Sequence, residues 1–276
     1  MADWVQPGGP TPHLALYEPH LVILIHGFNV NGEEANVSYV KFRRELRSAL
    51  SLGHEEVLGA FWEFHWPGDH PFKPVSTVTY SARIGAAESA GERLAEMLKK
   101  LSATQEVTLI AHSLGCRVAL ETVRRVLSGN YNRGARVRNV FLLAAAVPVH
   151  DCAARGRYSG EARDPEHVFY SDRDEVLISA FKLGQYPYHP SAKDEAVGQH
   201  GWPWLRWKTA TRTRLRHGGY WSSRRVAREI VMLMEARHGR LLPDRGYASS
   251  GLPLQEREVI SRTIPERALP VRIHKQ

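Results

Sequence analysis

Ser113 is the residue of this 276-residue chain whose type and surroundings best suit covalent chemistry. It lies in the segment Ala111-His112-Ser113-Leu114-Gly115. The aliphatic residues before this segment predict a buried strand, and apolar residues after it recur at helical spacing as far as Ser128. A serine in a tight strand-to-helix turn has an exposed hydroxyl close to a helix N-terminus, where free N–H groups and the helix dipole favour negative charge. The pattern therefore predicts a nucleophilic serine.

A second polar loop, which contains glycine, follows the unbroken aliphatic run at residues 21–25. Such a run is typical of a strand that is buried on both faces of a parallel sheet. The loop begins His26-Gly27-Phe28-Asn29. Because ligands bind at the carboxyl ends of strands in open α/β sheets, we expect this loop to lie beside Ser113 and Asn29 to line the substrate pocket.

A serine hydroxyl needs a neighbouring base to become a good nucleophile. Two histidines near the end of the chain are candidates, His217 and His200. His217 is favoured because it lies between a predicted last strand and a predicted last helix. The acid that would orient the base is expected just after the predicted strand at residues 167–170, where Asp172 and Asp174 are both available. Asp174 also has a simpler alternative role as the cap of the helix that follows.

Strand-like and helix-like segments alternate along the chain, which predicts an α/β fold with a mostly parallel sheet and helices on both faces. Further strands are expected at residues 57–66, 140–147 and 208–215, and helices at about 32–50, 78–101, 175–182 and 223–238. Asn31 or Gly32 is expected to cap the first of these helices, and Ser222 or Ser223 the last. The connection at residues 149–166 is short, which indicates a minimal cap.

The loop after residue 25, the serine turn, the acidic segment and His217 occur in the order oxyanion loop, nucleophile, acid, histidine. In these features the chain resembles the α/β-hydrolase superfamily, in particular bacterial lipase- and esterase-like members of undefined substrate. The resemblance covers about residues 20–238 and implies an α/β-hydrolase fold. Ala111 departs from the pattern, since glycine is commoner at that position.

Carried over position by position, the resemblance implies that Ser113 is the nucleophile, His217 the general base and Asp174 the acid. Asp174 is preferred to Asp172 because Asp-x-Val-Leu looks like the acid position of the family. The backbone N–H groups of Phe28 and Leu114 would form the oxyanion hole.

These expectations together predict a serine hydrolase that cleaves carboxylic esters through an acyl-enzyme intermediate. Lipid esters are among the candidate substrates. Water is the second substrate, and no metal or cofactor is expected. Aromatic loops at residues 61–72 and 186–207 are candidates for the wall of an apolar acyl pocket, and Trp66 is expected to contact the substrate. The alternative from another class is a non-catalytic binding or scaffold protein with the same fold.

The formal net charge of +8 and the pI near 9.6 raise the question of an anionic partner. Arginines are denser at residues 206–216 and 224–228, but no nucleic-acid-binding motif accompanies them, so no specific nucleic-acid partner is expected. A solvated basic face is the simplest interpretation; of the functional interpretations, an acidic substrate or peripheral contact with an anionic membrane is the better one. The oligomeric state is left open.

Two cysteines, Cys116 and Cys152, do not indicate a disulfide framework, and Cys116 is expected to be buried. The first residues lack a basic start followed by an apolar run, and no apolar stretch approaches the length of a membrane span, so a cytoplasmic protein is expected. We expect an N-terminal arm at residues 1–19, a catalytic domain at 20–238 and a C-terminal extension at 239–276.

Overall fold

The computed structural model describes residues 4–7, 18–68, 77–128, 134–153, 156–158, 166–185, 195–201 and 209–239. The chain divides into one unit from Met1 to Arg240 and another from Leu241 to Gln276. All described residues belong to the first unit. The predicted C-terminal extension lies almost wholly outside them and stays a prediction.

A seven-stranded sheet forms the centre of the first unit, in the order β1-β3-β2-β4-β5-β6-β7. The strands are β1 (Trp4–Pro7), β2 (His20–Ile25), β3 (Ala60–His65), β4 (Glu106–His112), β5 (Arg136–Leu143), β6 (Glu166–Tyr170) and β7 (Thr209–Arg212). Neighbouring strands from β3 to β7 run parallel, while β1 pairs antiparallel with β3. The predicted mostly parallel sheet is confirmed.

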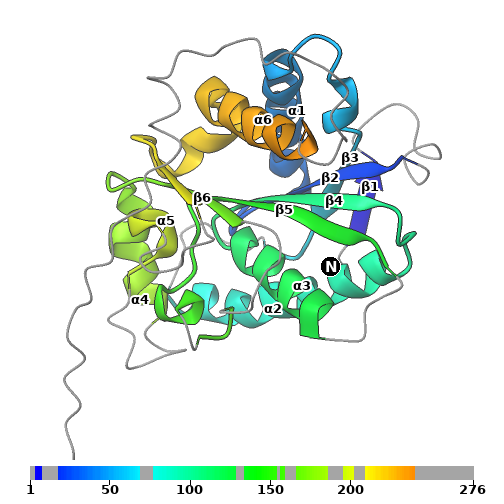
Figure 1. The fold of residues 1–276 in the computed structure, drawn as a ribbon. Helices are drawn as coiled ribbons and strands as arrows, with labels where there is room; N and C mark the ends of the chain where they lie inside the picture. Colours follow the sequence, from blue (N-terminus) through cyan, green and yellow to red (C-terminus); the bar gives the residue numbers. More distant parts are fainter. Residues whose placement is uncertain are drawn as a thin grey trace, which may run out of the picture. The chain divides into compact units, whose positions relative to one another are not determined.

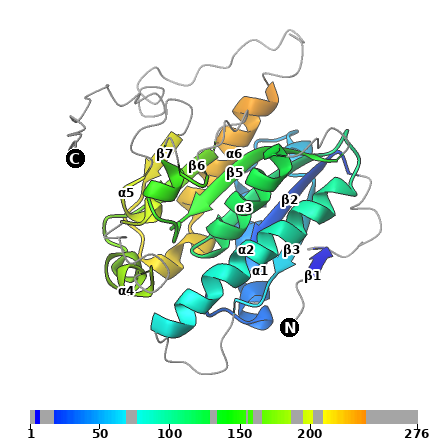
Figure 2. The same cartoon turned by 90° about the horizontal axis from the view of Figure 1, so that it is seen from below.

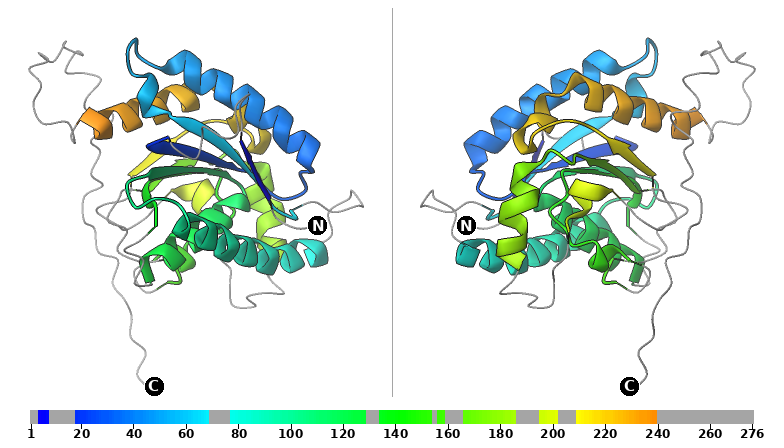
Figure 3. Two further views of the ribbon diagram at one scale, coloured as in Figure 1. Left: turned by 90° about the vertical axis from the view of Figure 1, so that its right-hand side faces the viewer. Right: turned by 90° about the vertical axis from the view of Figure 1, so that its left-hand side faces the viewer.

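Helices cover both faces of this sheet, as predicted. On one face lie α1 (Gly32–Ala49) and α6 (Arg224–Gly239), and on the other α2 (Thr77–Lys99) and α3 (Gly115–Ser128) (Figure 1). Figure 2 shows α2 and α3 in front of the strands, and the side views of Figure 3 show the sheet between the two helix layers. Two short helices, α4 (Phe181–Gln185) and α5 (Val197–His200), lie near β6, and none of the helices in the described ranges is long and apolar enough to cross a membrane.

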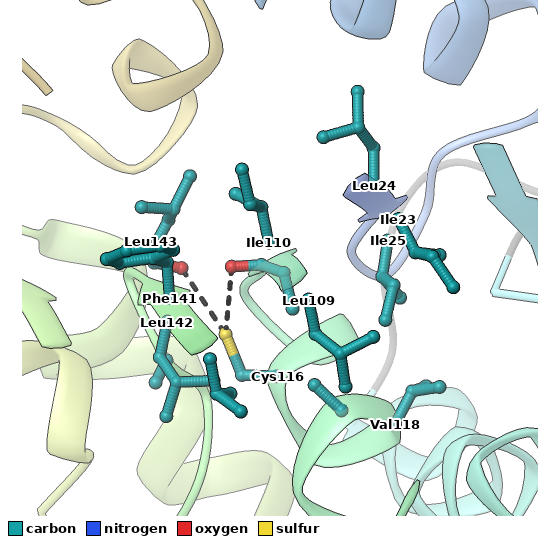
Figure 4. Close-up of a cluster of buried hydrophobic side chains, with 14 of the residues drawn as sticks. Ile23, Leu24, Ile25, Leu109, Ile110, Cys116, Val118, Phe141, Leu142 and Leu143 are labelled. Carbon is teal, nitrogen blue, oxygen red and sulfur yellow. Dashed lines mark hydrogen bonds between the residues drawn. The ribbon is translucent and has the colours of Figure 1, made fainter. Parts of the chain in front are cut away.

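The central strands are buried on both faces, which explains their continuous aliphatic sequences. All six residues of β2 are buried. Cys116, in the first turn of α3, points between β4 and β5 and donates to the carbonyl oxygens of Ala111 and Leu143 at 3.3 and 3.6 Å (Figure 4). Cys116 is buried, as predicted; Cys152 is buried as well, and the two form no disulfide. Burial raises the pKa of the Cys116 thiol well above its ordinary value. Cys116 therefore serves as a small core residue rather than a nucleophile.

Side-chain hydrogen bonds cap the N-termini of α1 and α6. The Asn31 side chain accepts from the N–H of Glu34, and the Glu34 side chain accepts from the N–H of Asn31, which completes a capping box at the start of α1. At the start of α6, the Ser223 hydroxyl accepts from the N–H of Val226 at 3.3 Å. The sequence predicted a cap at each of these places.

Several boundaries differ from the sequence prediction. The strand expected at residues 57–66 begins only at Ala60, because Glu55–Val57 forms the 3-10 turn η2 and Gly59 has φ +55°. The strand expected at residues 140–147 is β5, which ends at Leu143. Ala144, the next residue, has φ +47°, and its N–H donates to Phe169 rather than continuing the strand.

The helix expected after Asp174 is two elements, a π-helix η4 (Val176–Ala180) and then α4. Helix α5 lies in a segment predicted to be loop, and an ideal Cβ on Gly198 would lie 2.2 Å from the N atom of Ala145, so long-range packing holds this helix. The predicted N-terminal arm contains β1, which pairs with a strand far along the chain. Trp202, Trp204 and Trp207 lie outside the described residues.

The predicted minimal cap agrees with the connection between β5 and β6, whose described part contains the 3-10 turn η3 (His150–Cys152) and residues 156–158.

Candidate active site

Ser113 is the one residue between β4 and α3 with a left-handed backbone, at φ +54°. Hydrogen bonds hold this turn to the chain at the end of β5: the N–H of Ser113 donates to Leu143, and its carbonyl oxygen accepts from Ala146, at 2.9 and 3.1 Å. A non-glycine residue in this conformation is strained, and it persists because the surrounding structure determines it. The predicted strand, sharp turn and helix around Ser113 are therefore present.

Two glycines allow the polar loop after β2 to contact this turn. An ideal Cβ on Gly27 would lie 2.9 Å from the Cβ of Ser113, closer than real Cβ atoms come. An ideal Cβ on Gly115 would lie 2.2 Å from the carbonyl oxygen of His26. Glycine at both positions therefore brings the loop and the start of α3 together at the level of the backbone.

His217 bridges Ser113 and Asp174 through its two ring nitrogens. It begins the 3-10 turn η5 (His217–Ser222) after β7. Its Nε2 lies 2.8 Å from the Ser113 hydroxyl oxygen, and its Nδ1 lies 2.8 Å from Oδ2 of Asp174. Because an ionised carboxylate only accepts hydrogen bonds, the neutral ring has its proton on Nδ1, and Nε2 is left to accept from the serine hydroxyl. This is the arrangement in which an imidazole can remove the serine proton.

The carboxyl group of Asp174 is fully buried and held on both oxygens. Oδ1 accepts from the N–H of Leu177 at 3.1 Å, and Oδ2 from His217. Asp174 thus both caps the first turn of η4 and orients the histidine. The two roles that the sequence left as alternatives are compatible.

The competing candidates lie elsewhere. Asp172 is exposed and forms an ion pair with Arg212. His200 is exposed and pairs with Glu195 at 3.0 Å. The structure therefore brings Asp174 and His217 to Ser113, and gives Asp172 and His200 other partners.

The two backbone N–H groups predicted for an oxyanion hole, those of Phe28 and Leu114, donate to no acceptor in the described part of the chain. The next N–H, that of Asn29, donates to the carbonyl oxygen of Gly68 at 2.8 Å, and Asn29 has φ +58°. The loop is therefore turned tightly just after Phe28. Asn29 itself is half-buried in this loop. Within the described residues, neither N–H group is used by a protein acceptor, and their role as an oxyanion hole stays a prediction.

Trp66 holds this loop through a buried hydrogen bond, and the expected contact with substrate stays a prediction. Trp66 is 4% exposed, and its indole N–H donates to the carbonyl oxygen of His26 at 2.8 Å. The two rings stack with centroids 5.7 Å apart, and Nε2 of His26 accepts from the backbone N–H of Trp66 at 3.3 Å. The indole reaches this partner between the ends of two neighbouring strands, β2 and β3, a contact that local sequence pattern does not reveal.

The aromatic residues of the predicted pocket wall at residues 61–72 are core residues where the structure describes them: Phe61, Trp62 and Phe64 lie in β3 and are buried. The aromatic pair that adjoins the oxyanion loop is Phe28 and Tyr80, packed edge to face with centroids 5.6 Å apart. Phe28 is half-buried, and sequence reasoning did not single out either ring as a wall of the site.

Within the described residues, no group of three histidine, cysteine or acidic side chains is arranged to hold a metal ion.

No curated protein matches the chain, but several solved structures are similar to it. Among solved structures, XC6422 from Xanthomonas campestris, described as an α/β serine hydrolase without lid, has 16% identity and a TM-score of 0.43, with 87% of this chain and 89% of that chain covered. A carboxylesterase from Mesorhizobium loti has 14% identity and a TM-score of 0.41, with 80% and 92% covered. The Pyrococcus furiosus esterase Pf2001 has 13% identity and a TM-score of 0.38, with 82% of each chain covered.

The family comparison is the stronger finding. A family model described as "Alpha/beta hydrolase of unknown function (DUF900)" matches residues 14–232, which is most of the chain. The match includes the serine turn, Asp174 and His217 and agrees with the observed parallel sheet between two helix layers. The chain therefore belongs to this family of α/β hydrolases.

Proposed function

We propose that this α/β hydrolase is a serine hydrolase that cleaves carboxylic esters through an acyl-enzyme intermediate. One observation carries the proposal: His217 lies 2.8 Å from the Ser113 hydroxyl on one side and 2.8 Å from the buried carboxylate of Asp174 on the other. Serine alone is a poor nucleophile at neutral pH, and this relay supplies the base that it needs.

In the first half of the reaction, Nε2 of His217 takes the proton of Ser113 while Oγ forms a bond to the ester carbonyl carbon. The negative charge that develops on the carbonyl oxygen is stabilised by the N–H groups of Phe28 and Leu114, each typically worth about 100- to 1000-fold in rate. The Asp174 carboxylate stabilises the imidazolium. His217 then donates the proton to the leaving alcohol oxygen, the ester C–O bond breaks, and the acyl group stays on Ser113.

In the second half, a water molecule replaces the alcohol. His217 takes a proton from this water, the hydroxide oxygen bonds to the acyl carbon, and the same two N–H groups stabilise the second oxyanion. The bond to Ser113 then breaks, the serine recovers its proton from His217, and the carboxylic acid leaves.

The proposed substrates are small-molecule or lipid esters. The rings of Phe28 and Tyr80 place apolar surface beside the oxyanion loop, which suits an aliphatic acyl chain. We extend the proposal to Asn29, in the same loop, as a polar contact for the substrate. A series of p-nitrophenyl esters of increasing acyl length would define the substrate class, and a thioester and an amide of the preferred acyl group would test the ester preference.

The decisive experiment exposes the wild type and Ser113→Ala to a fluorophosphonate probe and measures the intact mass. We expect one adduct on the wild type, none on the variant, and ester turnover that disappears with the adduct. If folded wild type forms no adduct at several pH values, the serine hydrolase proposal is wrong, and a non-catalytic binding protein with this fold becomes the better interpretation.

Peripheral contact with an anionic membrane is a separate part of the proposal. The arginines at positions 212, 214, 216, 224, 225 and 228 are all exposed. Co-sedimentation with phosphatidylserine vesicles that weakens as salt rises, without binding to phosphatidylcholine alone, is expected. Equal binding to both kinds of vesicle, or to neither, would contradict it.

A further inference from the structure

His112 and Ser113, which are adjacent in the serine turn, contact the same residue from two sides. The Ser113 hydroxyl oxygen lies 2.8 Å from Nε2 of His217. Nε2 of His112 lies 2.7 Å from the backbone carbonyl oxygen of His217. One residue of the turn therefore holds the ring of His217, and its neighbour holds the backbone.

The direction of the second hydrogen bond is determined by its acceptor. A carbonyl oxygen cannot donate, so Nε2 of His112 carries the proton. His112 is 7% exposed, and burial together with the neighbouring His217 lowers its pKa to about 3. The ring is thus neutral at physiological pH and does not repel the imidazolium that forms on His217 during ester cleavage.

Packing leaves the His112 ring little freedom. Its centroid lies 4.9 Å from that of His217, 6.0 Å from that of Tyr220 and 5.8 Å from that of Trp221. Gly27 is also close, since an ideal Cβ on it would lie 3.2 Å from Nδ1 of His112. The donor is therefore aimed by its surroundings before any substrate binds.

The backbone of His217 needs this hydrogen bond to hold its position. Among the described residues no side chain caps the turn η5 that it begins, and Gly218 and Gly219 follow it directly. An ideal Cβ on Gly218 would meet no atom of the described residues within 4 Å, so these residues do not pack tightly at this position. Asp174 orients the ring of His217 through Nδ1, but a ring position also depends on where the backbone is.

We propose that His112 is a positioning residue for the catalytic base: its Nε2–H holds the carbonyl group of His217 and thereby keeps the imidazole between Asp174 and Ser113. Because it takes His217 as the base, this inference rests on the proposed function. A misplacement of about 1 Å in such an arrangement can lower the rate about 100-fold.

Three substitutions separate the donor from the shape of the ring. In His112→Gln the amide nitrogen is as many bonds from Cα as Nε2 of histidine, so it can reach the carbonyl group. In His112→Asn the same amide is one bond shorter and falls short. His112→Phe keeps a ring of similar size without a donor. Activity is expressed per folded molecule, as determined from urea unfolding of each variant.

We expect His112→Phe and His112→Asn to lower kcat for a p-nitrophenyl ester by about 10- to 100-fold with KM within twofold of wild type. His112→Gln should recover most of kcat. Equal kcat for the glutamine and asparagine variants, or a kcat of His112→Phe within twofold of wild type, overturns the proposal.

A second readout does not depend on turnover. The proton on Nδ1 of His217, shared with Asp174, is expected as a low-field proton NMR signal that His217→Ala removes. The signal should persist in His112→Gln and be lost or broadened in His112→Phe. If wild type turns over no ester but the signal follows this pattern, the proposed function fails and the positioning role stands. If wild type is active and His112→Phe keeps a sharp signal, only the positioning role fails.

Discussion

Gly115 and His26 meet at the level of the backbone: an ideal Cβ on Gly115 would lie 2.2 Å from the carbonyl oxygen of His26. The first turn of α3 and the end of β2 can approach this closely because residue 115 has no side chain. The loop that begins at His26 and the serine turn are therefore in direct contact, and a larger side chain at Gly115 must displace that loop.

Gly115→Ala should accordingly disturb both the fold and the site. We expect a loss of about 1–3 kcal/mol in the free energy of unfolding, as for other overpacked positions, and at least a tenfold loss of ester turnover. Gly85→Ala is the matched control, because an ideal Cβ on Gly85 in α2 meets nothing within 4 Å. Alanine there should be neutral or raise stability by up to about 1 kcal/mol. Urea unfolding measures both variants. Equal losses in the free energy of unfolding would contradict the close approach of Gly115 to His26.

The two neighbouring aspartates should differ sharply on mutation. Asp174→Asn keeps the size of the side chain but removes the charge that holds the His217 proton on Nδ1, and a loss of about 10⁴-fold in kcat is expected. Asp172→Asn removes only an exposed ion pair with Arg212, so kcat should stay within about twofold. Steady-state kinetics of the two variants on one ester give the comparison. The assignment of Asp174 as the acid fails if Asp172→Asn lowers kcat more than Asp174→Asn does.

Trp66 and Trp62 provide another matched pair. Trp66→Phe leaves the buried carbonyl oxygen of His26 without its indole donor, which should cost about 1–3 kcal/mol in the free energy of unfolding. The indole N–H of Trp62 is buried with no acceptor in the described part of the chain, so Trp62→Phe removes an unsatisfied group and should cost less. Thermal or urea unfolding measures the difference. A larger loss in Trp62→Phe would show that ring volume, not hydrogen bonding, dominates.

Buried histidines should make the protein less stable in mild acid. Burial lowers the pKa of His20 to about 4 and those of His112 and His167 to about 3. Between these values and the unfolded value near 6.5, the unfolded chain binds more protons, so the stability that these groups contribute is complete above about pH 6.5 and falls as the pH decreases toward 3. At pH 5, a histidine with a folded pKa near 3 should contribute about 2 kcal/mol less than at pH 7.5.

Urea unfolding at the two pH values tests this expectation. His167→Gln lacks one of the three groups, so its free energy of unfolding should change by about 2 kcal/mol less than that of wild type between pH 7.5 and pH 5. An equal change in the two proteins would mean that His167 does not titrate in this way.

Local sequence determined the elements that need no distant partner. The apolar run at residues 21–25 predicted the buried strand β2 because a strand covered on both faces excludes polar side chains. Asn31, one of the two expected caps, predicted a helix start because a capping side chain bonds to the backbone only a few residues further on. The aliphatic run before Ser113 and the helical spacing after it predicted the sharp turn, and the order of the motifs indicated the α/β-hydrolase family to which the chain belongs.

Only the tertiary structure decided which distant residues meet. His217 contacts a serine 104 positions earlier, and the Trp66 indole donates to the carbonyl oxygen of His26, just past the end of the neighbouring strand. In the same way β1 found a partner in β3, and α5 formed where Gly198 packs against Ala145. No local spacing encodes such contacts, because they depend on where the sheet brings the carboxyl ends of its strands together.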